Sequence, residues 1–134
     1  MLRAGGRLGT VTWAQEHGST AHALWDSALA DAGAPAAPLR RTDTGLDSPD
    51  AVEDLLREAR LRPERLWTER LEHRWDAASF YALATGSGVN RVRLEGVDKS
   101  TRRALLEHVR EGLEALAPDD FFWWGEVVCA VASR

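Results

Sequence analysis

The chain has 134 residues, of which 44% are hydrophobic and 28% charged, and its net charge is −4. These values are ordinary for one globular domain, and the scattered basic residues argue against a nucleic-acid partner. No apolar run approaches the ~20 residues needed to cross a membrane. The single cysteine, Cys129, cannot form an internal disulfide, so we expect a cytoplasmic protein.

The first predicted element is a short strand over residues 7–13. Gly5 and Gly6 can form the tight turn that leads into it. Leu8, Val11 and the neighbouring threonines suit a packed, pleated surface, which predicts an interior strand. We expect the strand to end at Trp13 and a polar turn to follow over residues 14–18.

Two helices are predicted next. Ser19 or Thr20 can cap a helix that runs to about Ala32, and Gly33 ends it. A loop follows over residues 34–47. Ser48 and Pro49 then begin a second helix, in which a hydroxyl cap precedes proline at the first helical position. The apolar stripes of these helices comprise Ala21, Leu24, Trp25, Ala28, Leu29 and Ala32 in the first, and Val52, Leu55, Leu56 and Ala59 in the second.

Residues 65–75 alternate in polarity, which predicts a half-buried strand at or near a sheet edge. Asp76 can cap a helix over residues 77–84, and residues 86–88 form a predicted mobile loop. A further helix begins at Asp98 or Ser100 and ends before Pro118. Residues 121–132 are apolar on both faces, so this last strand should lie inside a sheet.

Candidate chemistry gathers after the first strand. Because ligands bind beyond the carboxyl ends of parallel strands, Trp13, Gln15, Glu16 and His17 could meet a substrate there. An imidazole can accept a proton near neutral pH, so His17 is the candidate base. The alternatives are that Trp13 packs against the next helix and that His17 is a solvated loop residue.

The other histidines suit structural positions better. We expect His73 to lie in a core or an interface, and His22 and His108 to lie on helix surfaces. The histidines and Cys129 have no short ligand spacing, so no metal site is expected.

Several segments in order resemble class I S-adenosylmethionine-dependent methyltransferases, and are most similar to small-molecule enzymes of actinobacterial type. Residues 2–13 resemble a segment of the family that leads into its fifth strand. In that segment a leucine, a basic residue and a proline precede two glycines. The other similar segments are residues 24–26, 43–44, 72–76, 85–88 and 125–128. Two departures are Ala4, where the family prefers proline, and Arg60, where a helix-ending glycine is usual.

The resemblance implies that residues 1–134 are the C-terminal half of a Rossmann-like methyltransferase domain. This half of an α/β fold would hold about three strands, the last one antiparallel, and about four helices. The parent activity would be methyl transfer from S-adenosylmethionine to a small-molecule acceptor. The cofactor's main contacts would belong to the other half. Trp25, Phe80 and Tyr81 would line a lid over the acceptor, with core packing as the alternative.

Three arrangements remain open for such a half-domain. A separate subunit that carries the N-terminal half could pair with the strand at residues 7–13, because a bare apolar edge invites pairing. The chain could instead be a non-catalytic remnant that dimerises through the same strand. It could also be a piece of a complete enzyme.

Overall fold

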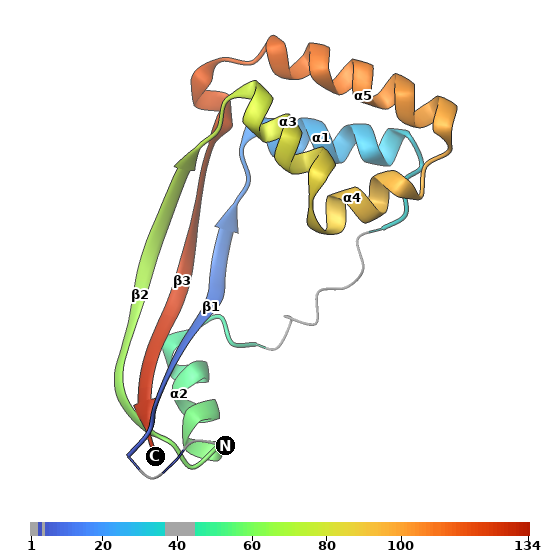
Figure 1. The fold of residues 1–134 in the computed structure, drawn as a ribbon. Coiled ribbons are helices and arrows are strands. Elements are labelled where there is room, and N and C mark those ends of the chain that lie inside the picture. The colour runs from blue at the N-terminus through green and yellow to red at the C-terminus, as the bar shows by residue number, and fades with distance from the viewer. Residues whose placement is uncertain (1–2, 4, 37–44) are drawn as a thin grey trace. The chain divides into compact units, whose positions relative to one another are not determined.

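The computed structural model describes residues 3, 5–36 and 45–134 (Figure 1). Leu2, Ala4 and residues 37–44, which include Asp43 and Thr44, lie outside this part of the chain. The described elements, in chain order, are β1 (Arg7–His17), α1 (Thr20–Asp31), α2 (Pro49–Glu58), β2 (Arg62–Arg74), α3 (Ala77–Gly86), α4 (Gly88–Glu95), α5 (Lys99–Glu114), the 3₁₀ turn η1 (Pro118–Phe121) and β3 (Phe122–Ser133). The predicted α/β class is confirmed, and the described part has one helix more than the four expected.

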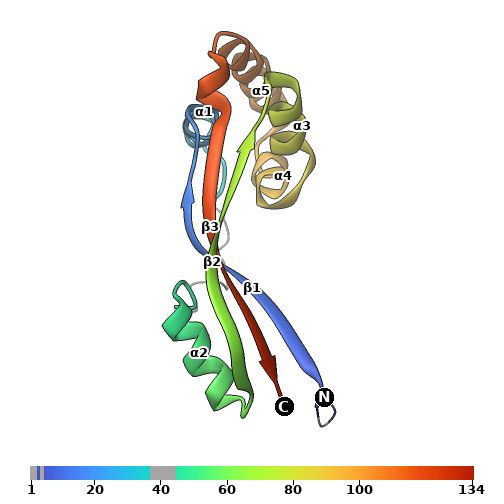
Figure 2. The same ribbon diagram turned by 90° about the vertical axis from the view of Figure 1, so that its left-hand side faces the viewer.

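The three strands form one sheet in the order β1-β3-β2 (Figures 1 and 2). β3 runs antiparallel to β1, from the pair Arg7 and Ser133 to the pair His17 and Trp124. The last strand is therefore interior and antiparallel, as predicted. β2 lies at one edge, as predicted. β1 lies at the other edge of the described sheet, where the expected half-domain leaves it. Its interior position in a complete sheet stays a prediction.

Contacts divide the described residues into two compact units. The sheet unit comprises the described residues of 1–17, 41–72 and 124–134, and the helical unit those of 18–40 and 73–123. Each unit has its own core, and we describe each by itself.

The core of the sheet unit lies between α2 and one face of the strands. Val52 and Leu56 of α2 pack against alternate residues of β3, namely Val128, Ala130 and Ala132. Leu55 is 45% exposed and Ala59 is also exposed, so the predicted apolar stripe is too wide. A short helix that packs on a sheet buries only the side chains that point directly at the sheet.

α2 ends in a left-handed turn that is centred on Arg60. The backbone φ of Arg60 is +59°, in the region that favours glycine. Arg60 N donates to Arg57 O and Leu61 N donates to Leu56 O, and each N···O distance is 2.9 Å. This pair of bonds is a Schellman motif. Arg60 therefore occupies a left-handed position that glycine would adopt without steric cost.

The core of the helical unit is built around α1. This helix was predicted with Ser19 or Thr20 as its cap, and Ser19 is the cap in the structure. Trp25 and Leu29 are 2% and 0% exposed. The other buried members are Ala21, Ala28, Phe80, Ala84, Leu94, Leu105, Val109, Leu113 and Phe121. Every helix of the unit contributes to this core.

The predicted loop at residues 86–88 is wrong, because α4 begins at Gly88 directly after α3. The φ of Gly88 is +60°, which lets the chain turn sharply between the two helices. Leu94 is buried in the core and anchors α4 there. Charged and polar residues dominate α4, and they hid its single buried position from the sequence pattern.

Candidate functional site

The carboxyl end of β1 lies four residues later than the sequence predicted. β1 continues through Gln15 and Glu16 to His17, and a β-bulge lies between Trp13 and Gln15. The predicted polar turn over residues 14–18 is therefore wrong. Trp13 lies within the strand, opposite Val127, and is 47% exposed. His17 is the residue that occupies the strand end.

His17 belongs to a layered cluster on the sheet unit. Its ring stacks on Trp124 with centroids 4.0 Å apart and an interplanar angle of 22°. The guanidinium carbon of Arg70 lies 4.3 Å from the centroid of the same indole. The imidazole and the guanidinium come from β1 and β2, the two strands that flank β3. Arg70 is also paired with Glu72 over 2.8 Å.

Gln15 controls the acceptor atom of His17. The amide nitrogen of Gln15 lies 2.9 Å from imidazole Nε2. An amide NH₂ only donates, so in the neutral ring Nε2 accepts and Nδ1 carries the proton. Nε2 is the atom that would take a proton from a ligand through its lone pair. To do so, it must give up the hydrogen bond from Gln15. The predicted residues Gln15 and His17 are thus brought together.

Sequence reasoning missed Trp124 and Arg70. Trp124 was assigned to a strand face that is covered by packing, and Arg70 to the polar face of its strand. Their partnership depends on the β1-β3-β2 order, which brings together residues that are over 50 positions apart in the chain. Alternation along one strand does not contain that information.

The helical unit holds the other predicted site residues, and it separates them. Trp25 and Phe80 are each 2% exposed and belong to the core. Their positions match core packing, which was the alternative to a lid. Tyr81 is half-buried and lines a cavity of about 420 Å³ between α3 and α5. Three residues proposed together for a lid therefore split into two core residues and one cavity residue.

The other histidines have different outcomes. His22 is half-buried rather than on the helix surface; its Nδ1 lies 2.8 Å from the Ser19 hydroxyl and its ring meets Phe80 edge-on at 4.8 Å. His73 is exposed in this chain, so it is not a core residue, and its place in an interface stays a prediction; its ring lies 3.9 Å from that of Trp75. His108 is exposed, as predicted.

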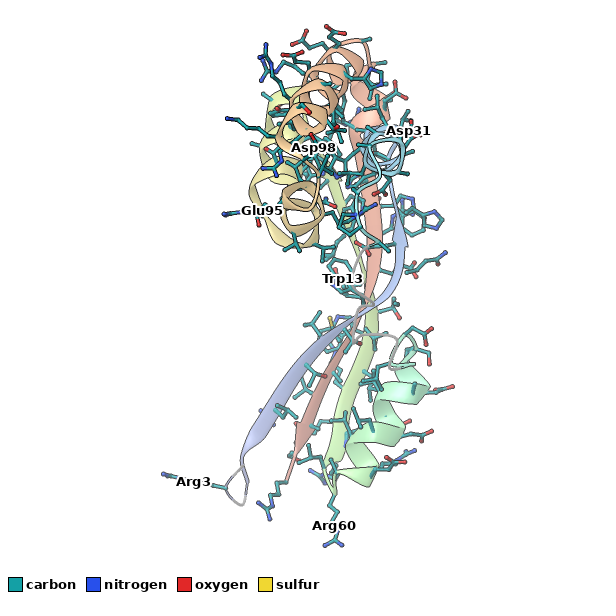
Figure 3. The ribbon with its side chains drawn as sticks, turned by 90° about the vertical axis from the view of Figure 1, so that its right-hand side faces the viewer. Arg3, Trp13, Asp31, Arg60, Glu95 and Asp98 are labelled. Carbon is teal, nitrogen blue, oxygen red and sulfur yellow. The ribbon has the colours of Figure 1, made fainter. Side chains whose placement is uncertain are left out.

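Among the described residues, two carboxylates have clearly perturbed pKa values, and both are helix caps. A bond from the Ser100 hydroxyl, with bonds from Thr101, holds the pKa of Asp98 well below its usual range. A backbone bond from Ser79 lowers the pKa of Asp76. Asp98 lies beside the start of α5 in Figure 3. These shifts reflect capping rather than a reaction centre.

The described residues do not include the glycine-rich strand-to-helix turn that characterises Rossmann-type dinucleotide sites. The strand-to-helix turn from β1 to α1 offers Gly18 and Ser19, but the Ser19 hydroxyl already accepts from His22 N, and Ser19 is 7% exposed. Gly86 and Gly88 lie between two helices.

Among the described residues, no group of three or more histidine, cysteine or acidic side chains could hold a metal ion. No helix in this part of the chain has the length and apolar character to cross a membrane.

Comparison with protein-family models finds none that matches this chain, and comparison with curated proteins finds no match either.

Proposed function

We propose that this chain is the acceptor-side part of an S-adenosylmethionine-dependent methyltransferase that acts on a small molecule. The observation that carries the proposal is the strand order β1-β3-β2 with β3 antiparallel to β1. The sequence resemblance implies this same arrangement, in which the final strand lies antiparallel between the fifth and the sixth. The left-handed Arg60 adds support, since it stands where the family usually carries glycine.

The acceptor would approach the cluster at the carboxyl end of β1. Ligands of α/β sheets bind beyond the carboxyl ends of parallel strands. There, His17 Nε2 would accept a proton from the acceptor, and Trp124, on which the imidazole stacks, would hold the His17 ring in place. Trp13, which is on the strand itself, would contact only an acceptor that extends along the sheet face.

The methyl donor's main contacts would come from residues outside the described part, because no cradle for it is found there. We therefore derive no step through the cofactor. We expect the purified 134-residue chain to show no measurable binding of S-adenosylmethionine in a calorimetric titration. Tight 1:1 binding would contradict this expectation.

The decisive experiment uses the native protein from source cells. An antibody against this chain would report the size of the native polypeptide and would purify it with any partner. The purified material would be tested for transfer of tritiated methyl groups from S-adenosylmethionine to a small-molecule extract of the same cells. We expect transfer. A native band at 14.8 kDa, together with no transfer by the purified material, would refute the proposal.

The role of His17 has a matched control in the same material. His17→Gln should lower the rate of methyl transfer, whereas His108→Gln should leave it unchanged. Both changes replace one exposed imidazole by an amide, and His108 lies on α5 of the helical unit. Equal rates in the two variants would exclude His17 as the proton acceptor.

A second candidate function is that of an interaction module. β1 is an edge of the described sheet, and it presents Val11 and Trp13 at 67% and 47% exposure. An apolar edge strand invites pairing with a second copy or with a subunit that carries the missing half. A homodimer would be favoured if light scattering shows a stable dimer and if Val11→Lys lowers the dimer fraction. Co-purification of a glycine-rich partner would favour a split enzyme.

A further inference from the structure

A cavity in the helical unit has the composition of a ligand site and is not explained by methyl transfer. It has a volume of about 420 Å³ and lies between the first turn of α3 and the last two turns of α5. Small-molecule sites in proteins are commonly in the range of ~300–1,000 Å³. Its apolar wall is formed by Ala77, Ala78 and Leu113, and its polar groups are Tyr81, Arg110 and Glu114.

Arg110 faces Tyr81 rather than its neighbour on the helix. The guanidinium carbon lies 5.3 Å from the centroid of the Tyr81 ring. Glu114 is one turn away on the same helix. Among the ion pairs of the described residues, there is none between Arg110 and Glu114. Their order along the helix, with the cation first, is the weaker one for such a pair. The guanidinium therefore keeps its fork of N–H donors for a carboxylate that enters the cavity.

The charge around Tyr81 is positive in sum. A second hollow of about 340 Å³ shares Tyr81 and Arg110 and adds Lys99, Arg102, Arg103 and Glu107 to the charged lining. Together the two hollows carry four basic and two acidic residues, which leaves two positive charges. Arg103 is paired with Glu107 over 3.1 Å. The Arg102 guanidinium donates to Glu95 O and Val97 O. Lys99 and Arg110 thus remain as the cations that could meet an anion at the Tyr81 ring.

We propose that the cavity between α3 and α5 binds a small aromatic carboxylate. The aromatic body would pack on Tyr81, Ala77 and Leu113, and Arg110 would hold the carboxylate through two parallel N–H bonds. The apolar wall requires a ring or a similar body, and Arg110 requires the anion. This inference stands on the helical unit alone, so it does not depend on the proposed methyl transfer.

The chain provides its own reporter, because Tyr81 is its only tyrosine. The complete 134-residue chain would be prepared with ¹³C-labelled tyrosine, so that one ring signal reports on the cavity. Titration with 2-naphthoate should shift this signal saturably, since a bound aromatic ring imposes a ring-current shift on its neighbour. Failure to reach saturation, or no shift, would overturn the proposal.

Two comparisons separate the anion from the ring. The neutral 2-naphthalenemethanol should bind about tenfold more weakly than 2-naphthoate, because it cannot make charge-assisted bonds to Arg110. Acetate should leave the tyrosine signal unchanged, because it has no aromatic body. Equal affinity for the alcohol would refute the role of the anion, and equal affinity for acetate would refute the role of the apolar wall.

Variants assign the effect to Arg110. Arg110→Gln should weaken binding by about tenfold, and Arg110→Lys should weaken it less, because lysine keeps the charge but lacks the planar fork. Arg91→Gln is the control: Arg91 is an exposed arginine of the same unit, paired with Glu95 and absent from the cavity wall. Equal losses in Arg91→Gln and Arg110→Gln would refute the site. If Arg110→Gln fails to fold, the comparison of naphthoate with its alcohol on the unmodified chain decides.

Discussion

Arg60→Gly should stabilise the protein, although it removes a charged side chain. A residue with a Cβ costs roughly 1–2 kcal/mol in the left-handed region, where Arg60 has a φ of +59°. Glycine avoids this cost but loses more freedom on folding, which offsets about 0.5–1 kcal/mol. The expected net gain is about 0.5–1 kcal/mol in the free energy of unfolding. For a chain of this size, that gain is a rise of about 2–4 °C in Tm.

The same molecule contains the reverse experiment. Gly33 ends α1 with a φ of +67°, and its turn has the same two bonds, from Gly33 N to Ala30 O and from Ala34 N to Leu29 O, each over 2.9 Å. A Cβ at Gly33 would meet no atom within 4 Å, so backbone strain alone should act there. Gly33→Ala should therefore destabilise the chain by about 1 kcal/mol.

Urea unfolding followed by circular dichroism would measure the free energy of unfolding of three variants, of which Arg60→Gly and Gly33→Ala are the first two. Arg60→Gln is the third, because it removes the charge while it keeps the Cβ, and it should leave stability nearly unchanged. A loss of stability in both Arg60→Gly and Arg60→Gln would show that the arginine side chain, rather than its backbone, governs this turn. A loss in Arg60→Gly alone would refute the strain argument directly.

Three further predictions concern other parts of the chain. Phe80→Ala should cost about 3–5 kcal/mol by leaving a cavity, whereas Leu83→Ala on the same helix, at a side chain that is 40% exposed, should cost much less in the same urea assay. Hydrogen bonds lower the folded-state pKa of Asp98, so its contribution to stability is present above pH ~4 and is lost as the pH falls. Asp98→Asn should therefore make stability depend less on pH in the acid range. Trp124→Leu should destabilise the sheet unit by about 1–2 kcal/mol, because two ring contacts of about 0.5–1 kcal/mol each are lost; an unchanged urea midpoint would contradict this.

Helix starts were predictable from the sequence because capping is local. Ser48 accepts from Ala51 N, Asp76 accepts from Ser79 N, and Asp98 accepts from Ser100 N and Thr101 N. Each bond joins residues no more than three positions apart, so the pattern of residue types contains all the information.

The candidate site was predicted only in part, because its members come from separate strands. Gln15 and His17 were identified from their position after an apolar segment. Trp124 and Arg70 join them only through the β1-β3-β2 order. In the helical unit, periodicity could not tell Phe80, which is in the core, from Tyr81, which lines a cavity, since they are adjacent on one helix.

The sequence by itself determined the type of most elements and where their helices begin. Tertiary structure decided how far β1 extends, because its polar last residues are held in the strand only by pairing with β3. It also decided that Leu56 rather than Leu55 is buried, and that α4 forms, because each depends on which surface lies opposite. A helix cap is satisfied within one turn of chain, whereas burial and strand pairing require a partner that is distant in the sequence.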